Sequence, residues 1–159
     1  MPNPIFRDTD GVLYELPEGE TVHWRPSAYG VLEVDGKTLM IEDGRGKGGW
    51  EFPGGGVEVD ENFSEAVVRE FFEETGYRVR LVDERPLWID TQSFYSKIYK
   101  KFFKSVLIFY RVELVDSARD ASAVNIVVPD EISAMEWVPT AELTTETCHR
   151  MTHGFLKQR

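Results

Sequence analysis

The sequence predicts an α/β domain in which one sheet packs against two helices. Three observations lead to this class. Short runs rich in β-branched and aromatic residues recur along the chain, an amphipathic stretch lies near its middle, and a second begins at Thr140. With 159 residues and 42% hydrophobic content, the chain can bury one full core. We therefore expect residues 1–159 to form a single domain.

The first predicted element is a β-hairpin. Residues 29–34 and 37–42 read as strands, and Asp35-Gly36 between them is a two-residue turn signal. The glycine-rich run 44–49 is expected to be a loop that leads into a short strand at Trp50.

A central helix is predicted between Asn62 and Gly76. Asn62 and Glu65 form a capping-box pattern, and Gly76 suits the left-handed position that ends a helix. At about 100° per residue, an apolar stripe and an acidic sector lie side by side on this helix. The stripe contains Val67, Val68, Phe71 and Phe72, and the acidic sector contains Glu70, Glu73 and Glu74. We expect the stripe to pack on the sheet and the acids to face a cleft.

The second half of the chain predicts more strands and a last helix. Residues 79–89 read as a strand interrupted by Pro86, and residues 105–114 as a central strand buried on both faces. A short strand is expected at residues 134–138. From Thr140, as N-cap, we expect a helix that carries Cys148, Met151 and Phe155 at core-like spacings.

The acidic sector indicates a metal site. Carboxylates three or four residues apart on a helix repel, and each close pair costs a few tenths of a kcal/mol. Mg²⁺ or Mn²⁺ would remove that cost and would also hold phosphate groups. Arg69 lies four residues before Glu73 and is placed to fix its carboxylate, and Glu61 lies in the favourable field of the helix N-terminus. An acidic helix alone is more often a solvated face, but the residues around these acids favour the metal site.

The run from Gly55 to Tyr77 resembles the signature of the Nudix hydrolase family, which includes MutT-like proteins. That signature is a Gly, five residues, a Glu, seven residues, Arg-Glu, an apolar residue, any residue, Glu-Glu, any residue, a Gly and an apolar residue. The fixed positions fall on Gly55, Glu61, Arg69, Glu70, Glu73, Glu74 and Gly76. The preceding Trp50-Glu51-Phe52-Pro53-Gly54-Gly55-Gly56 is typical of the family. The aromatic Phe71 and Tyr77 depart from its more common aliphatic residues.

The resemblance implies a fold, a reaction and a set of site residues. It implies an α/β/α sandwich around a mixed sheet, and metal-dependent hydrolysis of a phosphoanhydride bond in a nucleoside diphosphate derivative, such as a (d)NTP or an oxidised nucleotide. Glu70, Glu74, Glu73 and the Gly55 carbonyl are the expected ligands of Mg²⁺ or Mn²⁺. Glu70, Glu73 and Arg69 are the expected catalytic residues, with Glu70 placed to orient or deprotonate the attacking water. Asp130 and Glu131 are candidates for a further acid from the second half of the chain.

Charge and composition restrict the partners. A net charge of −10 at a sequence pI of about 4.8 disfavours nucleic acid polymers and anionic membranes. Because this negative charge would also repel nucleotides, we expect the cation to take part in nucleotide binding. The single cysteine, Cys148, excludes an intramolecular disulfide and suits a reducing compartment, and no apolar run is long enough for a membrane span. We expect a cytoplasmic protein, whose sheet edges could join two copies as a homodimer.

The sequence leaves the substrate open. Arg45 and Lys47, just before the signature, are candidate phosphate contacts. Residues 91–104 carry lysines between aromatic residues, which fits either a nucleotide clamp or an edge strand whose lysines prevent aggregation. Tyr95, 18 positions after Tyr77, resembles a marker of dinucleoside polyphosphate hydrolases. The proline marker of ADP-ribose hydrolases is missing, because Gln92 stands there.

Two readings without hydrolysis stay open. A sensor that binds a nucleotide or an ADP-ribose derivative would not need the intact acids and Arg69. A Nudix-fold isomerase would want a cysteine near the pocket, and Cys148 on the expected last helix is poorly placed for that role.

Overall fold

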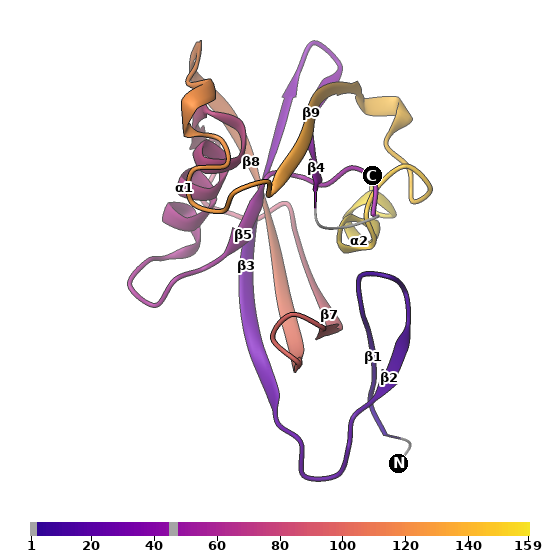
Figure 1. Cartoon of the computed structure of the whole chain (residues 1–159). Coiled ribbons are helices and arrows are strands. Elements are labelled where there is room, and N and C mark those ends of the chain that lie inside the picture. Colours follow the sequence, from indigo (N-terminus) through magenta and orange to yellow (C-terminus); the bar gives the residue numbers. More distant parts are fainter. Residues whose placement is uncertain (1–2, 45–47) are drawn as a thin grey trace.

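The computed structural model describes residues 3–44 and 48–159. It contains a mixed β-sheet with a helix on each side (Figure 1). The strands are β1 (Ile5–Arg7), β2 (Leu13–Glu15), β3 (Val22–Val34), β4 (Lys37–Asp43), β5 (Gly54–Gly56), β6 (Tyr77–Leu81), β7 (Trp88–Ser96), β8 (Lys101–Arg119) and β9 (Ile132–Pro139). The helices are α1 (Phe63–Thr75) and α2 (His153–Leu156), with 3₁₀ turns η1 (Ala121–Ala123), η2 (Thr140–Glu142) and η3 (Arg150–Thr152).

The sheet is built around a long parallel pair. β3 and β8 pair in parallel from Val22 with Phe102 to Leu32 with Val112. β7 lies antiparallel on the other side of β8, and the main strand order is β2-β1-β7-β8-β3-β4-β9. β5 pairs with β3, and β6 pairs with β8. The mixed sheet is therefore confirmed, and β8 is the central strand expected from residues 105–114.

The predicted hairpin is also confirmed. Asp35 and Gly36 both have positive φ, at 51° and 74°, as a two-residue turn that follows the twist of its strands requires. Only two residue pairs join β3 to β4, Glu33 with Thr38 and Val34 with Lys37. Beyond them β4 leaves β3 and pairs with β9. This separation gives the sheet its curl and leaves the middle of β3 free to pair with β5.

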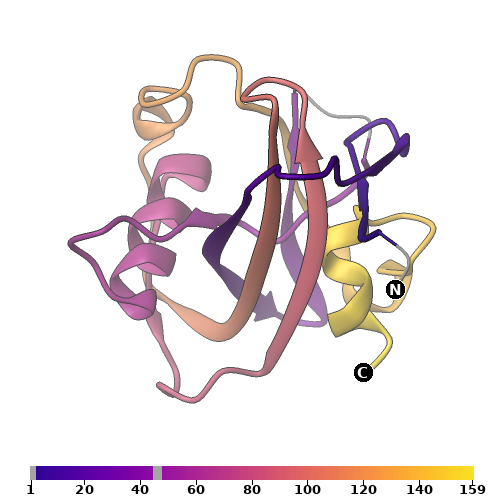
Figure 2. The same ribbon diagram turned by 90° about the horizontal axis from the view of Figure 1, so that it is seen from below.

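Two hydrophobic cores cover the two faces of the sheet. α1 packs on one face, and α2 with the C-terminal turns packs on the other (Figure 2). The α1 core includes Ala28, Leu32, Val67, Phe71 and Ile108, whereas the α2 core includes Tyr29, Phe52, Leu107, Phe109 and Phe155. This arrangement confirms the expected α/β/α layers.

The predicted helix from Thr140 is wrong over most of its length. The segment forms η2, an irregular stretch, η3 and the four-residue α2. Thr147 explains the break, because its hydroxyl accepts from the Thr144 amide at 3.0 Å and donates to the Glu142 carbonyl at 2.9 Å. Such side-chain bonds compete with helical backbone bonds. Cys148 and Phe155 are still buried, as their spacing predicted.

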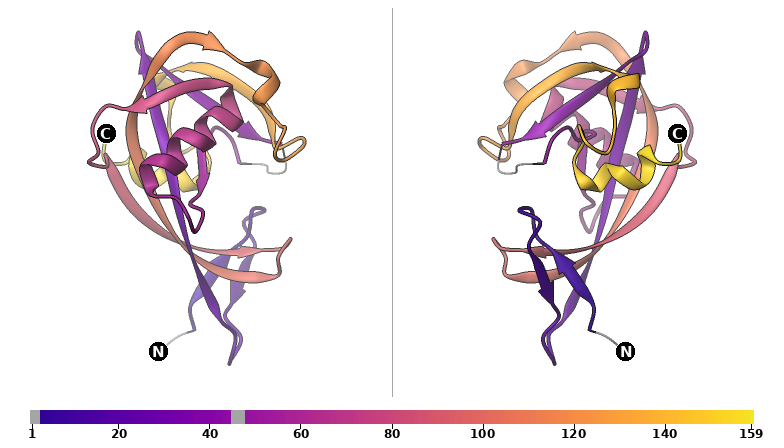
Figure 3. Two further views of the ribbon diagram at one scale, coloured as in Figure 1. Left: turned by 90° about the vertical axis from the view of Figure 1, so that its left-hand side faces the viewer. Right: turned by 90° about the vertical axis from the view of Figure 1, so that its right-hand side faces the viewer.

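The N-terminal hairpin of β1 and β2 extends the far end of the sheet (Figure 3). β1 joins β7 in parallel through Arg7 and Phe94. The Asp8 carboxylate is buried in this junction and accepts from the Tyr14 hydroxyl at 3.1 Å. Lys97, in the turn between β7 and β8, lies 3.5 Å from Asp8 and also pairs with Asp10. Among the helices of the described residues, none has the length and apolar character needed to cross a membrane.

Candidate active site

Helix α1 forms where the capping signals placed it. The Asn62 side chain accepts from the Glu65 amide at 3.0 Å, and the Glu65 carboxylate accepts from the Asn62 amide at 2.8 Å. Gly76 ends the helix in the left-handed region, with φ of 75°, and its amide donates to the Phe72 carbonyl. Val67 and Phe71 are buried as expected. Phe72 is only half-buried, and the Arg78 guanidinium covers its ring at 4.9 Å.

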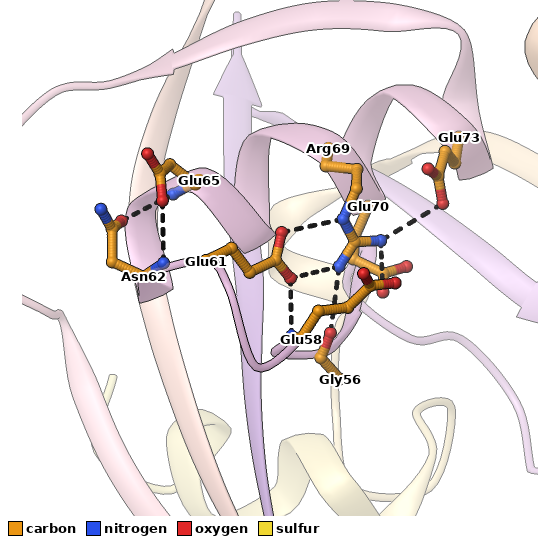
Figure 4. Close-up of polar contacts among 8 residues, drawn as sticks. All are labelled: Gly56, Glu58, Glu61, Asn62, Glu65, Arg69, Glu70 and Glu73. Carbon is orange, nitrogen blue, oxygen red and sulfur yellow. Dashed lines mark hydrogen bonds and ion pairs between the residues drawn. The ribbon is translucent and has the colours of Figure 1, made fainter.

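Arg69 is the hub of the polar contacts on this helix (Figure 4). Its Nε and Nη2 donate to the two carboxylate oxygens of Glu61, at 2.9 and 2.5 Å. Nη1 lies 3.3 Å from Glu73 and 3.0 Å from Glu70. Nη2 also donates to the Gly56 carbonyl at 3.1 Å. The expected contact with Glu73 is present, but the two-pronged bond to Glu61 is the shorter one and ties α1 to the loop before it.

Glu70 and Glu74 face the glycines of β5. Glu74 is buried, and its Oε2 accepts from the Gly54 amide at 2.7 Å. The Glu70 carboxylate packs against Gly55 so closely that a Cβ on Gly55 would lie 2.7 Å from its Cδ. Gly54 itself has φ of 150°, and a Cβ there would lie 2.2 Å from the Ala28 carbonyl oxygen. These glycines therefore let backbone and carboxylates approach closely.

The electrostatics of these acids differ from those of a solvated face. Burial raises the pKa of Glu74 well above its usual value, and the charges of Glu70, Glu131 and Glu51 add to the rise. Burial also raises the pKa of Glu70, against the lowering effect of Arg69. Hydrogen bonds from Arg69 instead lower the pKa of Glu61. Glu70 and Glu74 are thus held where their charges repel, whereas Glu61 is neutralised.

The donor set fits a hard divalent cation. Carboxylate oxygens and backbone carbonyls are the ligands that Mg²⁺ and Mn²⁺ prefer, and a cation would offset the repulsion between Glu70 and Glu74. Within the part of the chain that the structure describes, no three acidic, histidine or cysteine side chains already converge as a cation cage. Contacts with Arg69 occupy Glu73 and one oxygen of Glu70. The assignment of Glu70, Glu73, Glu74 and Gly55 as ligands stays a prediction.

One of the two candidate acids from the second half of the chain acts electrostatically on Glu70 and Glu74. Glu131 is among the charges that raise the pKa of both Glu70 and Glu74, whereas Asp130 is not. Asp130 is exposed and adopts a positive φ of 58°. Both residues stay candidates for the further acid, and Glu131 is the one whose charge raises the pKa of Glu70 and Glu74.

Glu51 and Arg25 are the residues that sequence reasoning missed. Glu51 contributes to the raised pKa of Glu74, and one of its carboxylate oxygens lies 3.5 Å from Nδ1 of His149. Glu51 lies within the Trp50-to-Gly56 run, which is typical of the family, and this position is the signal that could have identified it. The Arg25 guanidinium lies 3.4 Å from the position that a Cβ on Gly56 would take. Arg25 lies on β3, 31 residues before Gly56, and nothing in the local sequence marks it.

Of the three expected substrate contacts, Tyr95 is the one that lies among the described residues. Arg45 and Lys47 lie outside the described residues. Tyr95 packs on Tyr14 and Phe102, with ring centroids 4.3 and 4.8 Å apart. The segment 91–104 therefore forms the β7–β8 hairpin, whose Tyr95 ring contributes to the packing of the N-terminal hairpin. Whether it also contacts a nucleotide stays a prediction.

Comparison with known proteins agrees with the signature and the fold. The model of the NUDIX domain matches residues 23–156 of the chain.

The chain belongs to the Nudix family. Its sequence is 32% identical over 108 residues to a MutT-like protein of Streptomyces ambofaciens. That match covers 65% of this Nudix chain and 62% of the length of the relative.

Several solved structures share the architecture. A MutT Nudix hydrolase from Burkholderia pseudomallei is 25% identical, with a TM-score of 0.54 over 76% of this chain and 87% of that one. The MutT protein of Methanosarcina mazei Go1 is 23% identical, with a TM-score of 0.60 over 86% and 93% of the two chains. An ADP-ribose pyrophosphatase from Streptococcus suis is 19% identical, with a TM-score of 0.54 over 77% and 85%. At 23% and 19% identity, the latter two matches show a similar fold and nothing further.

Proposed function

We propose that this Nudix protein hydrolyses a phosphoanhydride bond of a nucleoside diphosphate derivative, such as a (d)NTP or an oxidised nucleotide, with Mg²⁺ or Mn²⁺ as cofactor. The observation that carries the proposal is the packing of the Glu70 and Glu74 carboxylates against β5. Both carboxylates are placed where burial raises their pKa, and Glu131 and Glu51 add negative charge nearby. Such a concentration of acids would be stabilised by a cation, which would also bind the diphosphate.

Each residue then has a role. A bound cation would neutralise charge on the bridging and leaving oxygens while water attacks phosphorus. Glu70, whose raised pKa suits proton transfer, orients the water or accepts its proton. Glu70, Glu74 and the Gly55 carbonyl would hold the cation, with Glu73 as a further ligand. Arg69 fixes Glu61 and Glu73, which keeps the loop before α1 closed on the helix.

We infer that residues 1–159 act as one domain. The N-terminal hairpin lies outside the family match of residues 23–156, yet β1 pairs with β7 and Phe6 is buried against Phe102 at a centroid distance of 5.0 Å. The hairpin therefore shares a core with the strands of the Nudix domain.

Glu70→Gln tests the proposal. The wild-type protein and the variant would be incubated with Mg²⁺ and a panel of (d)NTPs, oxidised nucleotides, dinucleoside polyphosphates and nucleotide sugars, and products separated by chromatography. We expect hydrolysis of at least one class by the wild type, and loss of most turnover in the folded variant. Wild-type turnover by Glu70→Gln at saturating Mg²⁺ would contradict the site assignment. Tight binding without product by the wild type would instead support a sensor.

A further inference from the structure

A second polar site lies outside the acidic cluster, at the junction of β1, β7 and the C-terminal turns. A cavity of about 540 Å³ opens there. Four cationic side chains and one carboxylate line it, and they are Arg7, Lys104, Arg150, Lys157 and Asp90. The whole chain carries a net charge of −10. The cavity therefore concentrates positive charge on a protein that is otherwise strongly acidic.

Three of these four cations have no carboxylate partner among the described residues. Among residues 3–44 and 48–159, no carboxylate oxygen lies within 4.0 Å of a charged nitrogen of Arg7, Arg150 or Lys157. Arg150 is half-buried, and its pKa is lowered first by that burial and then by the charge of Arg7. Two arginines that repel each other beside a cavity favour an anion, because it would neutralise both.

A neutral acceptor lies beside the same cavity, in the side chain of Gln92. The Gln92 side chain is oriented by its Nε2, which donates to the Arg150 carbonyl at 3.0 Å. Its Oε1 is buried and has no hydrogen-bond partner among the described residues. A buried acceptor without a partner costs free energy that a ligand donor could recover. The ligand that fits best has an anionic group and a neighbouring hydroxyl or amino group.

We propose that this cavity binds a phosphate group, held by Arg7 and Arg150 with support from Lys104 and Lys157. Arginine forks match the oxygens of phosphate with two parallel bonds. A hydroxyl or amino group beside that phosphate donates to Gln92. The site is made by the N-terminal hairpin together with the C-terminal turns, so it exists only when both ends of the chain dock on β7.

The sheet places this cavity two strands away from Arg25. Ser105 of β8 pairs with Gln92 on one side and with Arg25 on the other, so their side chains share one face. Neighbouring strands are about 4.8 Å apart, which places Gln92 and Arg25 roughly 10 Å from each other. Arg25 adjoins Gly56 of β5. Either a phosphate group of the substrate or a free phosphate could occupy the cavity.

The binding test uses the protein without metal, so its result does not depend on the proposed hydrolysis. Inorganic phosphate and ADP would be titrated in EDTA into the wild type, Arg7→Gln, Arg150→Gln and Lys157→Gln, with heat of binding as the readout. We expect saturable binding that weakens about tenfold on loss of either arginine, the effect of one charged hydrogen bond. Lys37→Gln, an exposed lysine outside the cavity, is the matched control and should bind like the wild type.

Folding is checked by thermal unfolding of each variant. Arg150→Gln keeps the backbone carbonyl that accepts from the Gln92 side chain, and Lys157 is exposed beyond α2. The variants Arg150→Gln and Lys157→Gln should therefore unfold at the same temperature as the wild type. Absence of saturable binding of both probes at millimolar concentration would overturn the proposal. So would unchanged affinity in the folded Arg7→Gln/Arg150→Gln double variant.

Steady-state kinetics with Mg²⁺ then identify the source of the phosphate. A higher KM with unchanged kcat in Arg150→Gln would show that the phosphate belongs to the substrate. Unchanged kinetic constants together with lost phosphate binding would show a site for free phosphate. Each of these two outcomes supports the proposed site.

Discussion

Arg69 and Glu61 form a two-pronged ion pair, with Nε and Nη2 donating to the two carboxylate oxygens at 2.9 and 2.5 Å. The pair spans eight residues and fastens the loop after β5 to the second turn of α1. Glu61 accepts in addition from the Glu58 amide at 2.8 Å. The acids of α1 are therefore positioned by a contact that lies beside them.

Glu61→Gln should weaken both folding and cation binding. The variant loses a charge-assisted bond, which should lower the free energy of unfolding by about 1.5–3 kcal/mol. Arg69 should then move closer to Glu70 and Glu73 and compete with the cation. Urea unfolding measures the first effect, and the Mg²⁺ concentration for half-maximal activity measures the second. Glu58→Gln keeps the backbone amide that Glu61 needs, so it is the control. An unchanged Mg²⁺ requirement in Glu61→Gln would contradict this role.

Gly55→Ala should disturb the site more than the fold. The new Cβ would lie 2.7 Å from the Cδ of Glu70, so the carboxylate must move while the backbone stays extended. We expect a loss of turnover with a loss of stability below about 1.5 kcal/mol, as for a small volume change. Gly56→Ala is the matched control, since its Cβ would meet only Arg25 at an ordinary 3.4 Å. Equal activity in the two variants would argue against the placement of Glu70.

Glu74→Gln should change the pH dependence of stability. Burial raises the pKa of Glu74 above the usual 4.5, so the folded protein favours its neutral form. Glu74 therefore contributes stability that is present below pH 4.5 and lost as the pH rises through the raised pKa. In EDTA, the variant should match the wild type at acidic pH and exceed it at higher pH. Denaturant unfolding across pH measures this difference, and added Mg²⁺ should reverse it. A difference independent of pH would exclude this account.

Gly30→Ala should loosen α1 from the sheet. A Cβ on Gly30 would lie 2.7 Å from Cδ2 of the buried Phe71. Overpacking of this kind costs about 1–3 kcal/mol. Phe71→Leu would make room, so the double variant should lose less stability than the sum of the two single variants. Thermal unfolding of the four proteins gives the coupling energy, and strict additivity would show that the two residues do not compete for space.

The sequence predicted the features that depend on a few adjacent residues. Asn62 with Glu65, Gly76, and the Asp35-Gly36 turn all act locally, and each is found where it was expected. The prediction of the terminal helix was wrong because the hydroxyl groups of Thr144 and Thr147 make hydrogen bonds with nearby backbone. Hydrophobic spacing carries no information about such competition.

Contacts between distant segments could not be predicted in this way. The roles of Arg25 at β5 and of Arg7 beside Arg150 depend on the pairing of strands far apart in the sequence. Arg69 was expected to hold Glu73, since offsets of four meet on a helix. Its stronger contact with Glu61 depends on how the preceding loop folds back, which helical spacing does not specify.

The parallel pairing of β3 with β8 has a consequence for folding kinetics. Val22 pairs with Phe102 and Leu32 with Val112, so each partner is 80 residues away along the chain. All of α1 lies within the loop that this pairing closes. Contacts of such long range form slowly, whereas a capped helix can form early. During refolding, helical signal should recover before the acids of α1 meet β5, and Mg²⁺ binding should lag behind both.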